Sequence, residues 1–126
     1  MQPCDELKTL VLQHYGKFTA SGLTEPIRET YSLQKGVTII AADSKEWFDN
    51  RNAILRFIEE GSASKLEIGV ENLAAYCEGS VGWTADQVKV QLPDGAALTV
   101  RHTRIFHQED GAWKLVHLHV SIPVTG

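Results

Sequence analysis

Apolar residues near the N-terminus recur at steps of three and four, the spacing of one face of a helix. We therefore predict a helix from Pro3 to Ala20, with Pro3 in its first turn and Gly22 just beyond its end. The residues of this apolar stripe are Leu7, Leu10, Val11, Tyr15 and Phe18.

Shorter elements are predicted between this helix and residue 65. Pro26 to Tyr31 fits a second, short helix, and the apolar run Val37–Ala41 fits a strand. Asp43 or Ser44 is placed to cap a turn. Asn50–Glu60 carries apolar residues at helical spacing, so we expect a third helix that ends at Gly61.

From Lys65 onward the apolar period changes to two, which is typical of strands. Turn-forming residues recur at 78–80, 93–95 and 109–111, and they separate four segments rich in β-branched and aromatic residues. The pattern predicts a four-stranded antiparallel meander. Because strands of this length are seldom flat, we expect the sheet to curve around the helices.

The alternation changes parity twice, near Glu71–Asn72 and near Asp86–Gln87. One extra residue in a strand has this effect, and such a bulge bends the strand. We therefore predict bulges at both places, with chance irregularity as the alternative.

The last strand offers two distinct faces. One row is wholly apolar and is expected to face the helices; it comprises Val116, Leu118, Val120 and Ile122. The opposite row contains Trp113, Leu115, His117 and His119. This second row is too apolar to remain exposed comfortably, which predicts a homodimer through the outer face of the sheet.

On the preceding strand, His102 and Arg104 interrupt an inward row of apolar residues. Because buried charge is costly without a partner, this pair predicts a polar-lined cavity. Arg104 would bind a carboxylate there, and His102 would act as a catalytic acid or base. The alternative is a structural pair, with Arg104 bridging to an acidic residue on a neighbouring strand.

Trp47 and Trp83 are predicted to line the same cavity as an aromatic wall for an apolar ligand, or else to pack in the core. Four acidic residues are weaker candidates for a general base, and more often such residues cap helices or face solvent: Asp43, Glu46, Asp49 and Asp86.

His117 and His119 have the spacing of a two-histidine metal motif but lack a third ligand, so no metal is predicted. We also expect no cofactor, because no phosphate loop or dinucleotide motif is visible.

Composition narrows the class of protein. The 126 residues suit one domain spanning 1–126, with 43% hydrophobic and 22% charged residues. A net charge of −4 argues against nucleic-acid binding, and no apolar run reaches the length of about 20 residues that a membrane helix needs. Cys4 and Cys77 do not form a disulfide framework, so we expect reduced thiols in a cytoplasmic protein.

The segment Thr103–Pro123 resembles the C-terminal strands of SnoaL-like proteins and the end of the association domain of calcium/calmodulin-dependent protein kinase II. Asp43–Phe48 and Gly82–Asp86 are similar to other SnoaL-like segments. The order of the elements resembles the nuclear transport factor 2-like superfamily, which includes ketosteroid isomerase. The resemblance implies a cone-shaped α+β fold with N-terminal helices packed on a curved antiparallel sheet.

The resemblance leaves function open, because this scaffold carries many activities. Arg104 matches one carboxylate-binding arginine of the kinase domain, whereas Val120 stands where another would be and Ala85 or Asp86 replaces a third. Our first hypothesis is a protein that binds an amphipathic, carboxylate-bearing small molecule in the cone pocket. The alternatives are an isomerase, dehydratase or cyclase that uses His102, and an oligomeric assembly module.

Overall fold

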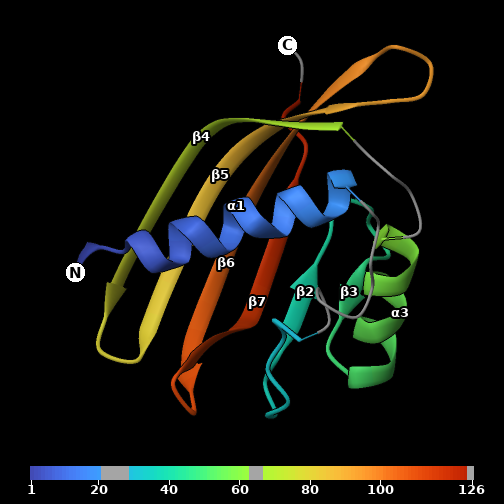
Figure 1. Ribbon diagram of the computed structural model, residues 1–126. Coiled ribbons are helices and arrows are strands. Elements are labelled where there is room, and N and C mark those ends of the chain that lie inside the picture. Colours follow the sequence, from blue (N-terminus) through green and yellow to red (C-terminus); the bar gives the residue numbers. More distant parts are fainter. Residues whose placement is uncertain (21–28, 63–66, 125–126) are drawn as a thin grey trace.

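Two helices and seven strands form the part of the chain that the computed structural model describes, residues 1–20, 29–62 and 67–124. In chain order they are β1 (Gln2–Pro3), α1 (Asp5–Ala20), β2 (Thr38–Ile40), β3 (Trp47–Phe48), α3 (Arg51–Ser62), β4 (Glu67–Glu78), β5 (Val81–Gln91), β6 (Ala97–Glu109) and β7 (Ala112–Ser121). The strands lie in the order β1-β4-β5-β6-β7-β2-β3 in one sheet. The predicted α+β class is confirmed (Figure 1).

The meander of β4, β5, β6 and β7 is antiparallel throughout, as predicted. Its two tightest turns contain Gly79 and Gly111, which have φ angles of 60° and 80°, a conformation that favours glycine. At the edge of this meander, β2 pairs with β7 in parallel, a pairing that the sequence pattern did not predict.

One of the two predicted bulges is present. The register between β4 and β5 shifts between Val70 and Asn72, which confirms the first. The second is wrong, because β5 pairs with β6 without interruption through Asp86 and Gln87. The even-numbered residues of β5 therefore share one buried face, which comprises Gly82, Thr84, Asp86 and Val88.

A bulge that we did not predict lies in β7. His117 pairs with Ile105 and Leu115 pairs with Phe106, so Val116 is an extra residue in this strand. The bulge turns Leu115 into the core, where it is only 3% exposed. The predicted outer row is therefore wrong for Leu115, and also for Trp113, which packs against the core and donates a hydrogen bond from Nε1 to Glu6.

The inward apolar row of β7 is confirmed at its centre. Leu118 is buried, and Val120 is partly buried and packs against the core. Ile122 lies beyond the strand and is largely exposed, and the bulge places Val116 outside the row that faces the helices.

The helix boundaries differ in small ways from the predictions. Pro3 pairs with Tyr76 in β1 instead of starting the helix, so α1 begins at Asp5. Asn50 caps α3 by accepting a hydrogen bond from the Ala53 N–H at 2.9 Å, and this helix continues past Gly61. The short helix expected at 26–31 falls mostly outside the described residues, and Tyr31 forms an isolated bridge with Leu115. The predicted strand at 37–41 is confirmed as β2.

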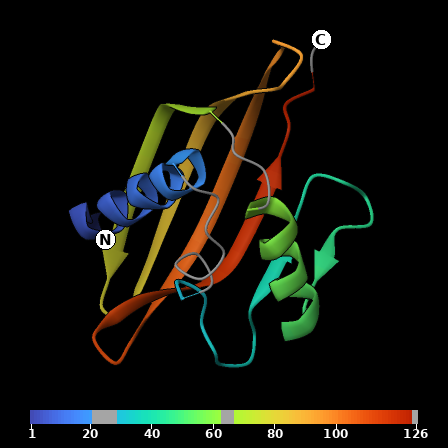
Figure 2. The same ribbon diagram turned by 45° about the vertical axis from the view of Figure 1, so that its right-hand side comes forward.

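Both helices lie on one face of the sheet. Helix α1 lies across β4 and β5, and α3 lies beside β2 and β3 (Figures 1 and 2). Leu7, Val11 and Tyr15 form the buried stripe of α1 at steps of four. Ile54 and Ile58 of α3 are also buried. The helices and the inner face of the sheet therefore enclose a common core.

Gly82 allows α1 to approach the sheet closely. A Cβ atom there would clash with Leu7 Cδ1 and would lie 3.0 Å from the Tyr76 carbonyl oxygen. Because Leu7 is completely buried, Gly82→Ala is expected to lower the free energy of unfolding by about 1–3 kcal/mol in urea denaturation. Gly69→Ala is the matched control, since no atom lies within 4 Å of its added Cβ. Equal effects of the two substitutions would contradict the close approach.

Candidate functional site

Four polar side chains meet beneath α1, and we call them the Asp86 cluster: Tyr15, Asp86, His102 and Arg104. Tyr15 belongs to the buried stripe of α1. Asp86 of β5 lies directly opposite His102 of β6, and Arg104 follows on the same face of β6. The cluster therefore joins three elements that are far apart in the sequence.

Asp86 is the centre of this cluster, and its side chain is 0% exposed. Arg104 Nη1 donates to Oδ2 at 2.6 Å, and the Tyr15 hydroxyl lies 2.8 Å from both carboxylate oxygens. His102 Nδ1 lies 2.9 Å from Oδ1. Arg104 Nη2 also donates to the Tyr15 oxygen at 3.2 Å, and its Cζ lies 5.2 Å from the Tyr15 ring centroid. This geometry matches the structural alternative for Arg104, a bridge to an acidic residue on the neighbouring strand.

The cluster holds one fixed positive and one fixed negative charge. Burial alone would raise the pKa of Asp86, but the hydrogen bond from His102 and the charge of Arg104 hold it below its ordinary value. Burial alone would lower the pKa of Arg104, but the interactions with Tyr15 and Asp86 outweigh this effect and raise the pKa above its ordinary value. Burial also raises the pKa of Tyr15, so its hydroxyl stays protonated. The Asp86–Arg104 pair is thus neutral overall.

His102 is held in a neutral form. Burial lowers its pKa below the ordinary value of 6.5, and the nearby charge of Arg104 lowers it further against the opposing effect of Asp86. The anionic Asp86 favours the tautomer with the proton on Nδ1. Nε2 then carries the lone pair, and this nitrogen has no hydrogen-bond partner among the described residues.

An inner cavity of about 260 Å³ lies against this cluster. Its walls come from the inner face of the sheet and from both helices, and most of them are apolar. The lining residues are His14, Tyr15, Tyr31, Phe57, Ile58, Ile68, Val88, Val90, Val100, His102, Arg104, Leu118 and Val120. The predicted cavity beside His102 and Arg104 is therefore present, but its lining is mostly apolar and not polar.

The aromatic residues expected at this cavity lie elsewhere. Trp47 is 64% exposed in β3, and Trp83 stacks on Tyr76 with ring centroids 5.1 Å apart on the outer face of the sheet. Neither lines the inner cavity, so their predicted positions are wrong. Trp83 points outward because β5 lacks the second bulge.

From the sequence, Asp86 was only a weaker candidate for a general base, and Tyr15 was not predicted to belong to the site. If the alternation of β5 is taken to continue without a break through Val88, it predicts that Asp86 points inward beside His102. The other acidic candidates do not reach the cluster: Asp43 and Glu46 hold the turn before β3 through hydrogen bonds to backbone N–H groups, and Asp49 lines a different hollow.

The outer face of the sheet carries Trp83, Ile105 and His117 side by side across three strands. Homodimer formation through this face stays a prediction.

Within the ranges that the structure describes, no group of three His, Cys, Asp or Glu residues could hold a metal ion. None of the described helices is long and apolar enough to cross a membrane.

The family model of the SnoaL-like domain matches residues 12–125. A search of curated proteins gave no match.

Solved structures share the fold at low sequence identity. A proposed dehydratase of the NTF2-like family from Streptomyces avermitilis has a TM-score of 0.84 at 14% identity, with 96% of each chain covered. An NTF2-like protein of unknown function from Pseudomonas putida has a TM-score of 0.78 at 14% identity, covering 98% of this chain and 92% of that one. A proposed ketosteroid isomerase from Shewanella frigidimarina has a TM-score of 0.73 at 17% identity, covering 90% of this chain and 92% of that one.

Proposed function

Given that the chain belongs to the SnoaL-like domain family, we propose that it binds a small, largely apolar molecule in the inner cavity and that His102 moves a proton on this molecule. The observation that carries the proposal is the Asp86–His102 hydrogen bond at the wall of an apolar cavity. Asp86 orients the imidazole, which leaves Nε2 as the base. The proposed activities of the relatives, an isomerase and a dehydratase, belong to the same class of reaction.

The reaction would begin with proton abstraction next to a carbonyl group. His102 Nε2 takes the proton from carbon, and the electron pair moves toward the carbonyl oxygen. Return of the proton at another carbon gives an isomer. Alternatively, hydroxide leaves from the neighbouring carbon and takes the proton from the imidazolium, which gives an alkene and water. Both routes need only the neutral His102 that the site stabilises.

The prediction of a carboxylate-bearing ligand assumed that Arg104 has no acidic partner within the protein. Asp86 already neutralises this guanidinium at 2.6 Å, so a second anion at the cluster would face a negative charge. We therefore propose that the group bound beside His102 is uncharged, such as a carbonyl or a hydroxyl. The apolar walls favour an aliphatic or aromatic body of modest size.

Filling the cavity tests this proposal. Val120→Phe adds volume at the cavity wall, and it is expected to weaken binding of flat ketones such as 2-indanone or 2-tetralone at least about 10-fold in NMR titrations. Ile105→Phe on the outer face of β6 is the matched control and should leave binding unchanged. Equal loss in both variants, or binding that moves no signal of a cavity residue, would reject the inner cavity as the site.

A further inference from the structure

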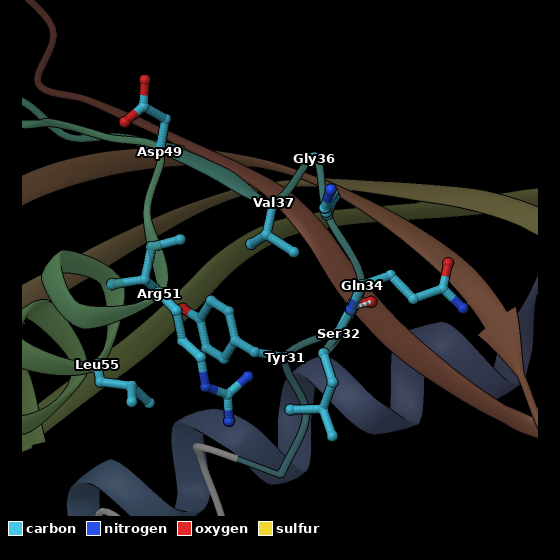
Figure 3. Close-up of a pocket in the computed structure, with 11 residues that line it drawn as sticks. Tyr31, Ser32, Gln34, Gly36, Val37, Asp49, Arg51 and Leu55 are labelled. Carbon is cyan, nitrogen blue, oxygen red and sulfur yellow. Dashed lines mark hydrogen bonds between the residues drawn. The ribbon is translucent and has the colours of Figure 1, made fainter.

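A second hollow of about 430 Å³ adjoins the inner cavity at Tyr31, and we call it the outer hollow. It is bounded by the segment 31–37 and by the first turns of α3 (Figure 3). Of the residues that the structure describes, Tyr31 is the one that lines both spaces. The α3 helix contributes to both as well, with Ile54 on the outer side and Ile58 on the inner side.

Tyr31 lines both spaces, so they adjoin at this side chain, and its hydroxyl group has no hydrogen-bond partner in the described ranges. The residue as a whole is only 7% exposed, and a tyrosine hydroxyl at a cavity wall can donate a hydrogen bond to a ligand. Its backbone is fixed, because Leu115 accepts from the Ser32 N–H at 3.0 Å and donates to the Thr30 carbonyl at 2.6 Å. Burial raises the pKa of Tyr31 to about 12, so the hydroxyl remains a donor at neutral pH.

The outer hollow is locally cationic in a chain whose net charge is −4. Lys35 and Arg51 line it, and neither forms an ion pair within the described ranges. Asp49 is the one acidic residue of the lining, and its carboxylate points away from the Arg51 guanidinium (Figure 3). The inner cavity has no comparable excess of positive charge, because Asp86 neutralises the Arg104 guanidinium at its wall.

We propose that the outer hollow binds the carboxylate of an elongated ligand, with Arg51 as its cationic partner and Tyr31 as a hydrogen-bond donor, while the apolar body of the ligand extends past Tyr31 into the inner cavity. This inference rests on the proposed function for the apolar part. It assigns the substrate class as an aryl or alkyl carboxylic acid whose charged end stays outside the reactive site. A planar guanidinium and a phenol provide the donors that a carboxylate accepts.

The test compares 5-phenylpentanoate with 5-phenylpentan-1-ol, which share one apolar body, by titration of backbone amide signals. The acid is expected to bind the wild-type protein about 5- to 10-fold more tightly than the alcohol. Arg51→Met should abolish this difference and leave the affinity for the alcohol unchanged. Arg56→Met is the matched control, since it removes the same charge from an exposed position on α3 and should preserve the difference. Tyr31→Phe should weaken binding of the acid about 3- to 5-fold.

Three results would overturn the inference: an acid that binds no more tightly than the alcohol, equal losses in Arg51→Met and Arg56→Met, or an unchanged affinity in Tyr31→Phe. If the alcohol still shifts the signals of His102 and Val120 in these cases, the proposed function stands and only the outer subsite fails. If neither compound shifts these signals, both proposals fail together.

Discussion

Replacing Asp86 with asparagine is expected to lower the free energy of unfolding by about 3–5 kcal/mol. The substitution keeps the shape of the side chain but removes the negative charge that Arg104 contacts at 2.6 Å. Arg104 is buried, and the described residues offer it no other anion. Urea denaturation at pH 7.5 measures the loss. A loss below about 1 kcal/mol would show that the Arg104 charge does not depend on Asp86.

Removal of the cation provides the informative comparison. In Arg104→Met, Asp86 keeps the donors Tyr15 and His102, and His102 can take up a proton to restore neutrality. We therefore expect a smaller loss than in Asp86→Asn, together with a rise in the pKa of His102, because Arg104 no longer repels its charged form. Arg101→Met on the same strand is the control, since its Nε donates to Gln87 at an exposed position. An unchanged pKa of His102 in Arg104→Met would contradict this coupling.

The sequence pattern was sufficient to predict the antiparallel meander because the evidence for it is local. Alternation and turn residues are set within each strand, so the four strands of the meander and their turns were predictable. The parallel pairing of β2 with β7 was not, since pairing between segments some 80 residues apart leaves no periodic signal in either one.

The candidate site was predicted in part. His102 and Arg104 were identified because polar residues interrupted an apolar row, and they do line the inner cavity. Trp83 was misplaced, and Asp86 remained a weak candidate, for one reason. The apolar residues Val81, Trp83 and Ala85 suggested an inward face, whereas the true inward row contains Gly82, Thr84 and Asp86. A buried row with a glycine, a hydroxyl and a carboxylate looks like a solvent-facing row until its partners from α1 and β6 are known.

The Val116 bulge had a similar effect on β7. One extra residue reversed the orientation of Leu115 and Trp113, and the regular alternation of that strand gave no sign of it. Register is fixed by the neighbouring strand, which the sequence of β7 alone does not specify. The predicted homodimer face must therefore be tested with Trp83 and Ile105, which do lie on the outer surface.

The second large effect is expected on proton transfer. If His102 is the base, His102→Gln should slow removal of a proton next to the carbonyl of a bound ketone by about 10²–10⁴-fold. Glutamine retains a hydrogen-bonding group of similar reach but cannot take up a proton. Because burial lowers the pKa of His102, the wild-type rate should reach its plateau at a lower pH than it would with an ordinary imidazole, and it should fall as the pH drops through the lowered pKa. His119→Gln, on the exposed outer face of β7, is the matched control.

Exchange of carbon-bound protons with D₂O, followed by NMR for 2-indanone and 2-tetralone, tests the central claim most directly. The account predicts exchange that is accelerated by the wild-type protein and by His119→Gln. It predicts that this acceleration is lost in both His102→Gln and Val120→Phe. Compounds that bind in the inner cavity yet exchange equally fast with the wild-type protein and with His102→Gln would contradict it.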